Sequence, residues 1–427
     1  MINYIMKIWK LKDLRNRILF TIGLLLIIRV LAHIPLPFID TSNLQKFFSN
    51  NPFLGILNMF TGGTMENFSI ILMGVGPYIT ATIIIQLLQM IVPSVEALSK
   101  EGEQGRQKLN YYSRLITVPL AIIQSWSMIK LLQSQKIVGS LSFSQLLILL
   151  IIATAGTILV MWIGEIITER GISNGISLII AFGIIAGLPG QIANTRNVLE
   201  LNHAPLLFVA IMTIIAVLLI IAFIILMTEG ERQIPISYAR RIKGTRTYGG
   251  VETHLPLRIN SAGVIPIIFA LSMVTFPPVL AQFLTTARSE FLKNIGNTIY
   301  DLFNNNNFFY GALYFIMVVA FTYFYTYIVF KPKEVAENLQ KNGGFIPGMR
   351  PGRETSNYLS YIISRITLTG AIFLAFIAVL PFIVSALYPN LSTIQLGGTS
   401  ILIVVSVIIE TMRQLQSEML MRTYEKY

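Results

Sequence analysis

The chain has 427 residues, of which 54% are hydrophobic and only 12% are charged, and its formal net charge is +12 at pH 7. This composition excludes an ordinary soluble fold, which would need a larger polar surface, so lipid is the expected solvent. The absence of cysteine excludes disulfides and metal–thiolate sites, and the widely spaced His33, His203 and His254 form no metal-binding pattern, so we expect no metal and no cofactor.

Ten apolar segments are each long enough to cross a hydrocarbon core of about 30 Å as a helix. The first follows five basic residues and has no small-residue cleavage site after it, which favours a transmembrane helix over a signal peptide. The fifth carries three glycines, which is typical of close helix packing or of a mobile element. In chain order the predicted spans are 18–37, 68–92, 112–132, 143–167, 174–193, 205–228, 259–284, 308–330, 359–387 and 391–410.

The basic residues predict the orientation of these spans. If the N-terminus is cytoplasmic, 24 of the 32 Lys and Arg residues fall on cytoplasmic stretches and six on the opposite side. Cytoplasmic loops of membrane proteins carry such an excess of basic residues, and ten spans then place the C-terminus in the cytoplasm as well. We therefore predict an all-α membrane protein with two five-helix halves, 1–193 and 205–427, joined by an external linker at 194–204. Transporters and channels are often built this way, with a site between the halves.

Two long basic loops lie on the predicted cytoplasmic side, at 229–258 and 331–358. The first contains the alternating stretch QIPISYA and the turn-rich stretch KGTRTYGG, which together predict a hairpin-like projection. The second contains GGFIPGMRPG around Arg350, a pattern typical of tight turns. Charge alone leaves two interpretations open: the loops only set the topology, or they dock a large partner with an acidic face.

The outer loop 38–67 has an apolar second half, Pro52–Gly63, with helical spacing. A short apolar helix outside the hydrocarbon either lies at the lipid interface or folds back into the bundle.

The sequence contains no nucleotide-binding loop and no nucleophile elbow, so we predict no enzyme. Ionisable residues inside a membrane cost about 2.5–3.5 kcal/mol and are functional candidates by default. Here they are few (Arg29, Glu165, Arg365 and Glu410), and pairing between helices or snorkelling explains them equally well. Prolines and glycines inside spans predict kinked helices that can open. These patterns alone indicate a channel or a transporter.

Ten longer motifs occur in order along nearly the whole chain, and together they resemble the SecY family of protein-conducting channels. They are IPLPFID (34–40), NMFTGG (58–63), MGVGPYITATIIIQLL (73–88), EGEQGRQK (101–108), ERGISNGISLIIAFGIIAGLP (169–189), ERQIPISYARR (231–241), THLPLRINSAGVIPIIFA (253–270), ENLQKNGGFIPGMRPG (337–352), RITLTGAIF (365–373) and GGTSILIVV (397–405).

The resemblance implies a multi-pass protein of the bacterial cytoplasmic (inner) membrane that passes unfolded preproteins across and releases hydrophobic segments sideways into lipid. It implies two small membrane subunits, SecE and SecG, and a motor ATPase, SecA, which would hydrolyse the ATP. The ribosome, preprotein signal sequences and membrane lipids are the other implied partners.

By position, the resemblance also implies roles for individual residues. An apolar pore ring would seal around a chain and offer ions no ligands; its members are Val75, Ile79, Ile180, Ile268 and Ile403. The family usually has isoleucine where this chain has the shorter Val75. The plug would be about 52–64, with Ile56, Leu57, Met59 and Phe60.

Spans two and seven would form a lateral gate, with Thr80, Gln86, Asn174, Ser272 and Phe276. Motor and ribosome docking would use Arg240, Arg241, Arg246 and Arg350. Without the resemblance, the isoleucines are ordinary packing residues and the polar residues simply bond neighbouring helices. Two other functions stay open at this point: a transporter of small solutes, and a scaffold that only recruits ribosomes.

Overall fold

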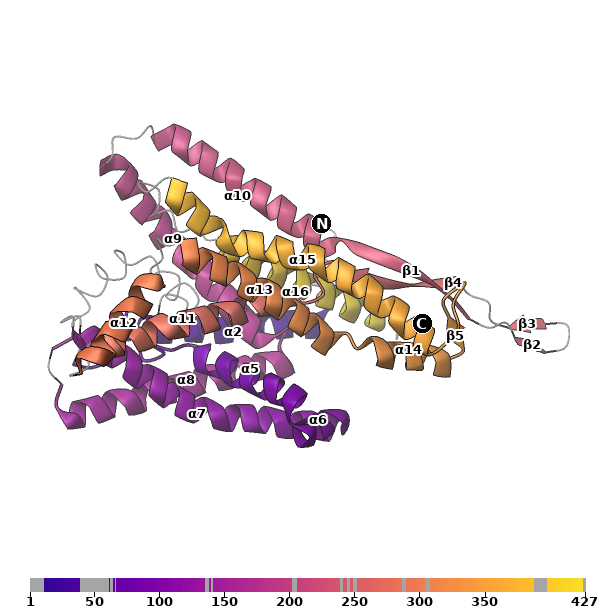
Figure 1. Ribbon diagram of the computed structural model, residues 1–427, viewed down its shortest axis with the longest axis horizontal. Helices are drawn as coiled ribbons and strands as arrows, with labels where there is room; N and C mark the ends of the chain where they lie inside the picture. Colours follow the sequence, from indigo (N-terminus) through magenta and orange to yellow (C-terminus); the bar gives the residue numbers. More distant parts are fainter. Residues whose placement is uncertain are drawn as a thin grey trace.

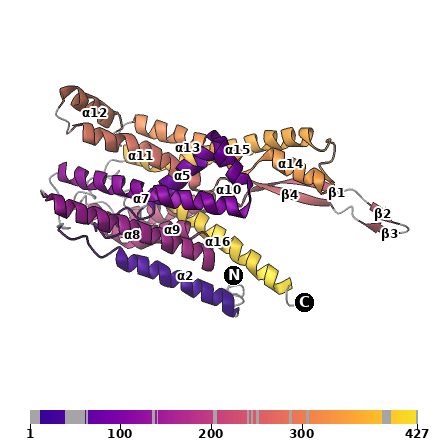
Figure 2. The ribbon, with the colours of Figure 1, turned by 90° about the horizontal axis from the view of Figure 1, so that it is seen from below.

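The computed structural model describes residues 11–38, 61, 64–65, 67–134, 138–139, 141–201, 206–238, 241–243, 246–248, 252–285, 289–303, 308–387 and 398–424. The described part is an elongated helical bundle with a small sheet at one end (Figures 1 and 2). The helices are α2 (Lys12–Leu31), α5 (Gly76–Ile91), α6 (Pro93–Lys100), α7 (Glu103–Ser134), α8 (Phe143–Arg170), α9 (Gly175–Leu201), α10 (Leu206–Glu229), α11 (Ile265–Thr285), α12 (Glu290–Leu302), α13 (Phe308–Val329), α14 (Pro332–Lys341), α15 (Arg353–Leu387) and α16 (Gly398–Tyr424).

Every predicted span contains a helix, although the boundaries differ. Within the described residues, five helices are individually long and apolar enough to cross a membrane, and the bent pair α5–α6 raises this to six. The protein is therefore a multi-pass membrane protein. The count of ten spans and the cytoplasmic position of both termini stay predictions.

Span two is shorter than predicted. Residues 67–75 form turns, and α5 begins only at Gly76, with Pro77 in its first turn. The chain then bends by 102° between α5 and α6. Pro93 explains the bend, because proline lacks the amide hydrogen that would continue the helix and holds the preceding Val92 in an extended conformation.

Several other helices run beyond the predicted spans, and α7, α9 and α16 do so by the largest margins. α7 begins at Glu103, nine residues before the predicted 112–132, and α16 continues to Tyr424, well past 410. α9 carries the chain to Leu201, so most of the predicted linker 194–204 is helical. These extensions are polar, and hydropathy alone marks only the part of a helix that lies in lipid.

The prediction of an all-α protein is wrong in one respect. Five short strands are present: β1 (Glu231–Tyr238), β2 (Arg241–Lys243), β3 (Arg246–Tyr248), β4 (Glu252–Arg258) and β5 (Gly344–Phe345). β1 pairs antiparallel with β4, and β2 with β3, so the predicted hairpin-like projection at 229–258 is confirmed. β5 comes from the other basic loop and pairs with β1, giving the strand order β4-β1-β5.

The two basic loops therefore form one folded body, built on a small apolar core. Ile234 and Ile236 of β1 are buried, as the alternation in QIPISYA predicts for a strand with one covered face. A core cluster joins this strand to the turn after β5 and to the start of α15; its buried members are Ile234, Leu257, Ile346, Leu359, Ile362 and Ile363.

The main core lies between the long helices. Its buried side chains come from both chain halves, with representatives such as Ile28 on α2, Val160 on α8 and Leu374 on α15. Buried threonines donate to the carbonyl one turn earlier, as Thr157 does to Ala153 at 3.0 Å, so they need no partner in lipid. By contrast, Leu218 and Leu219 on α10 are 59% and 65% exposed, as expected for a face that contacts acyl chains.

Candidate functional site

The five residues predicted to form the pore ring all belong to the main apolar core or pack against it. Val75 is the last residue before α5, Ile79 lies one turn into that helix, and Ile180, Ile268 and Ile403 lie on α9, α11 and α16. Val75, Ile180 and Ile403 are buried, while Ile79 and Ile268 are half-buried and pack against the same cluster. Four helices from distant parts of the chain therefore contribute aliphatic side chains to one region.

The short span two explains why Val75 takes part. The turns at 67–75 are held by backbone bonds to the end of span one, because Leu36 N–H donates to Phe68 at 2.8 Å and Ile70 N–H donates to Ile34 at 3.0 Å. Gly156 on α8 allows this segment to come close, since a β-carbon there would lie 2.2 Å from the carbonyl oxygen of Ile70. Val75 is thus placed by a buried turn and not by a continuous helix.

Most of the predicted plug lies outside the described residues, including Ile56, Leu57, Met59 and Phe60. The described end of the plug segment is attached to the bundle at Thr64, which is buried. Its hydroxyl lies 3.1 Å from the carbonyl oxygen of Thr61 and 3.2 Å from that of Leu72. The C-terminal end of the predicted plug is therefore bonded to the buried turn that precedes α5.

The two helices of the predicted lateral gate, α5 and α11, are in contact. Thr80 donates to the carbonyl of Gly76 at 3.1 Å, and Ser272 donates to that of Ile268 at 2.9 Å, so both hydroxyls bond their own helix. The amide oxygen of Gln86 is buried and has no hydrogen-bond partner among the described residues.

Two of the predicted gate residues, Asn174 and Phe276, differ from the other three. Asn174 is exposed and precedes α9, where its side-chain oxygen accepts from the backbone N–H of Ser177 at 3.2 Å, so it caps that helix. Phe276 lies on the described backbone of α11, but its side chain is outside the described part.

The docking arginines divide between the hairpin and the second loop. Arg241 and Arg246 lie on β2 and β3 at the far tip of the hairpin, whereas Arg240 is outside the described residues. Arg350 is exposed, and its backbone is fixed on both sides: its N–H donates to Glu354 at 3.3 Å and its carbonyl accepts from Thr355 at 2.9 Å. Gly352, with φ of 101°, closes this turn in a conformation that favours glycine. The turn therefore presents the Arg350 side chain from a rigid backbone.

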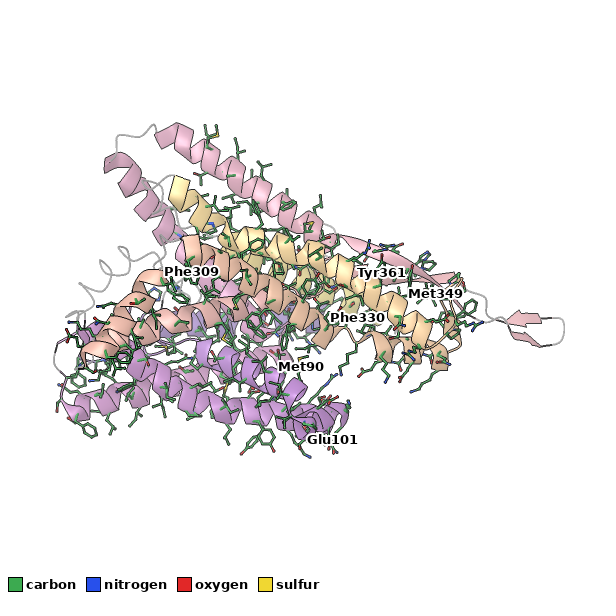
Figure 3. All side chains as sticks on the ribbon, viewed as in Figure 1. Met90, Glu101, Phe309, Phe330, Met349 and Tyr361 are labelled. Carbon is green, nitrogen blue, oxygen red and sulfur yellow. The ribbon has the colours of Figure 1, made fainter. Side chains whose placement is uncertain are left out.

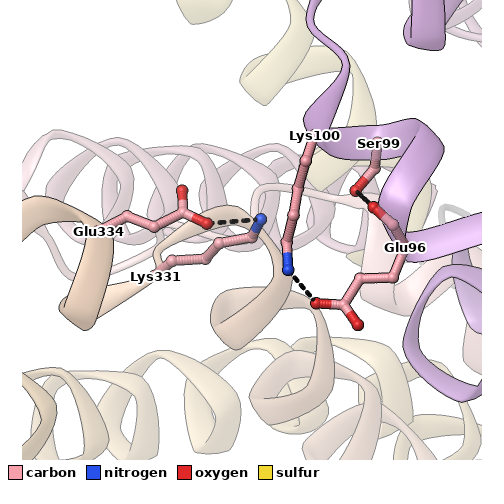
Figure 4. A network of polar contacts seen from close by, with 5 residues as sticks. All are labelled: Glu96, Ser99, Lys100, Lys331 and Glu334. Atoms are coloured by element: carbon pink, nitrogen blue, oxygen red, sulfur yellow. Dashed lines mark hydrogen bonds and ion pairs between the residues drawn. The ribbon is translucent and has the colours of Figure 1, made fainter. Parts of the chain in front are cut away.

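Sequence reasoning missed two pairs of charged residues, one on α6 and one at the start of α14, which lie opposite each other (Figure 4). Glu96 and Lys100 on α6 form an ion pair of 2.6 Å, and Lys331 and Glu334 at the start of α14 form one of 3.1 Å. The hydrogen bond and charge of Lys100 lower the pKa of Glu96, and the charge of Lys331 adds to this effect. Glu96 in turn raises the pKa of Lys100, with a further contribution from Glu334. The spacing of each pair was visible in the sequence, but the bend that brings α6 opposite α14 was not.

Comparison with known proteins gives consistent matches. A sequence model of the SecY family matches residues 69–412. The chain is 39% identical to the protein translocase subunit SecY of Mycobacterium bovis over 97% of both chains, and 38% identical to that of Streptomyces coelicolor over 98% of both. Its fold is similar to a protein-conducting channel (TM-score 0.62) and to Sec61 in the canine ribosome–channel complex from the endoplasmic reticulum (TM-score 0.60). Each structure is 19% identical, and each match covers 94% of this chain and 92% of the other.

Proposed function

This chain belongs to the SecY family, and from that premise we propose that it is the channel subunit through which unfolded preproteins cross the membrane and hydrophobic segments leave sideways into lipid. The single observation that carries this proposal is a shared location in the main apolar core, to which α5, α9, α11 and α16 bring the aliphatic residues Val75, Ile79, Ile180, Ile268 and Ile403. A ring of aliphatic side chains can close around an extended polypeptide and offers an ion no oxygen ligand.

The packing of the helices supports a pore between two halves, 1–193 and 205–427. Neighbouring helices in the first half pack in the chain α5–α7–α8–α9, and α2 packs on α8 and α9. The halves meet along α9 with α10 and α16, and along α11 with α5 and α7. In this proposal the seam of α5 and α11 is the lateral gate, and the segment about 52–64 is the plug that blocks the funnel on the outer side.

The folded body made by the hairpin and the turn at Arg350 is the proposed docking surface for the SecA motor and the ribosome. Its arginines belong to two loops that share one sheet, so one partner can contact both loops. ATP hydrolysis is assigned to SecA. SecE and SecG are the proposed small membrane subunits, and the proposed location is the bacterial cytoplasmic membrane with both termini in the cytoplasm.

A single-cysteine cross-link tests the proposal. The chain has no cysteine, so Ile403→Cys is a unique thiol, and a preprotein with its own cysteine can be stalled during transport into vesicles. We expect a disulfide between the two, and also with Ile79→Cys. Leu219→Cys on the exposed face of α10 is the matched control and should form none.

If the preprotein is stalled and neither pore cysteine forms a cross-link, the preprotein does not pass through this bundle. Uptake of small solutes would then be the next function to examine, and ribosome binding without transport would indicate a scaffold.

A further inference from the structure

A helix outside the predicted spans has an apolar edge that the bundle does not cover. α12 lies between α11 and α13 at the end of the bundle opposite the sheet (Figures 1 and 2). Its apolar residues recur three or four positions apart, so they share one face; they are Phe291, Leu292, Ile295, Ile299, Leu302 and Phe303. Charged and amide side chains occupy the opposite face, among them Glu290, Lys293, Asn294 and Asn297.

Only part of this apolar face is packed. α12 lies along α11, and Ile295, Ile299 and Phe303 are half-buried. Phe291 and Leu302 lie on the adjoining edge of the face, three turns apart, and are 72% and 44% exposed. A phenylalanine this exposed on an otherwise amphipathic helix indicates a further apolar contact.

The contacts of α12 fix its depth relative to the spans. The ring of Phe303 meets that of Phe309, in the first turn of α13, edge-on with centroids 5.8 Å apart. Figure 3 shows Phe309 at the end of α13 that lies far from Phe330 and the sheet. α12 is therefore attached to two apolar helices, along α11 and at the start of α13.

We propose that α12 is an interfacial membrane helix, and that the edge formed by Phe291 and Leu302 inserts into the lipid at the boundary of headgroups and acyl chains. Interfacial helices bury their apolar face about 5–10 Å into this boundary while the polar face stays in water. The described charged side chains of α12 are one cation, Lys293, and one acidic residue, Glu290. Insertion is therefore apolar in origin and does not require anionic lipid.

This proposal does not depend on the transported substrate, but it has a consequence for the proposed function. Because α12 packs along α11, it ties one helix of the proposed lateral gate to the membrane surface. Movement of α11 away from α5 would then have to drag or tilt a helix that is inserted in lipid.

Site-specific fluorescence on the complete protein tests the lipid contact. A polarity-sensitive dye is attached to Phe291→Cys or, separately, to Leu302→Cys, and each variant is reconstituted into phosphatidylcholine vesicles. The matched controls are Asn294→Cys and Asn297→Cys, which are exposed on the polar face of the same helix. Nitroxide groups are placed either near the lipid headgroup or at the end of the acyl chain.

We expect blue-shifted emission at Phe291 and Leu302, with stronger quenching by the shallow nitroxide than by the deep one, and little quenching at the two asparagines. The result should be unchanged when phosphatidylglycerol is added to the vesicles. Emission typical of water at both apolar positions would overturn the proposal. A blue shift without quenching would also overturn it, because the edge would then be covered by protein and not by lipid.

Discussion

Ile403 is the most informative single residue in the proposed ring, because it is 1% exposed and lies among side chains of several helices. Replacement by asparagine puts an amide into an apolar site, at a cost of about 1–3 kcal/mol when the amide is unpaired. We expect Ile403→Asn to weaken the resting seal and to let preproteins with defective signal sequences through. Transport of matched preproteins with intact and defective signals measures this, with Ile403→Leu as the control of similar volume. Unchanged signal selectivity would count against the ring.

Arg350 allows a test of docking that leaves the fold intact, because the side chains of Glu354 and Thr355 bond to its backbone while its own side chain is exposed. Arginines at the centre of an interface commonly contribute about 2 kcal/mol or more, which is roughly thirtyfold in affinity. Arg350→Glu should therefore reduce SecA-driven transport by about that factor, with little change in membrane insertion of the variant itself. Arg353→Glu, exposed on the first turn of α15, is the control for charge alone. Full activity of Arg350→Glu would remove this residue from the docking surface.

At the scale of elements, the sheet links two loops that lie far apart in the sequence. Ile346 is 3% exposed in the shared core, and truncation of a buried isoleucine to alanine costs about 2–5 kcal/mol. Because β5 pairs with β1, Ile346→Ala should loosen both loops, and limited proteolysis should become faster within 229–258 as well as within 331–358. Ile346→Val is the conservative control. Faster cleavage confined to 331–358 would show that the loops are independent.

The second interaction between elements is electrostatic, between the charged residues of α6 and those at the start of α14. Glu96→Lys would place like charges opposite Lys331. Because α6 follows α5, a helix of the proposed lateral gate, we expect easier opening and more transport of preproteins with defective signals. The double variant Glu96→Lys with Lys331→Glu should restore selectivity. The effect should weaken at high salt, because both pairs are exposed.

This link also has a predicted pH dependence. The pKa of Glu96 is lowered in the folded protein, so its contribution is complete above the ordinary carboxyl pKa and is lost as the pH falls through the lowered value. The signal selectivity of the wild type should therefore fall under acid, whereas that of Glu96→Gln, which lacks the carboxylate, should not change with pH. Constant selectivity in both proteins would contradict a role for this pair.

Much of this architecture follows from sequence patterns, and the exceptions have physical causes. Apolar segments predict the long helices well, because the backbone in lipid must bond within its own segment. The alternation around Ile234 predicts a strand of the hairpin. The pairing of β1 with the two residues of β5 could not be predicted, because register between distant segments depends on tertiary packing around Ile346. Likewise, α12 is too polar for a hydropathy window, although its three- and four-residue spacing was present in the sequence.

For the whole molecule, the arrangement of the halves predicts where the channel opens. The first half ends with α9 and the second begins with α10, so the chain itself connects the halves there. α9 also packs on α16, so packing contacts hold the halves together on the same side. On the other side of the described bundle, α11 meets α5 and α7, and neither of these helices is consecutive with it in the chain. Opening should therefore occur between α5 and α11, with the side of α9 and α10 acting as the hinge.

A reversible cross-link tests this arrangement. Thr80→Cys on α5 and Phe276→Cys on α11 are joined by a short reagent with a cleavable disulfide, in a chain that has no other thiol. We expect the bridged protein to lose transport of preproteins, because the seam can no longer separate, and to regain it when the reagent is reduced. Each single-cysteine variant treated with the reagent should stay active. Transport that continues through the bridged form would place the opening elsewhere, and the contacts of α11 with α7 would be the next seam to bridge.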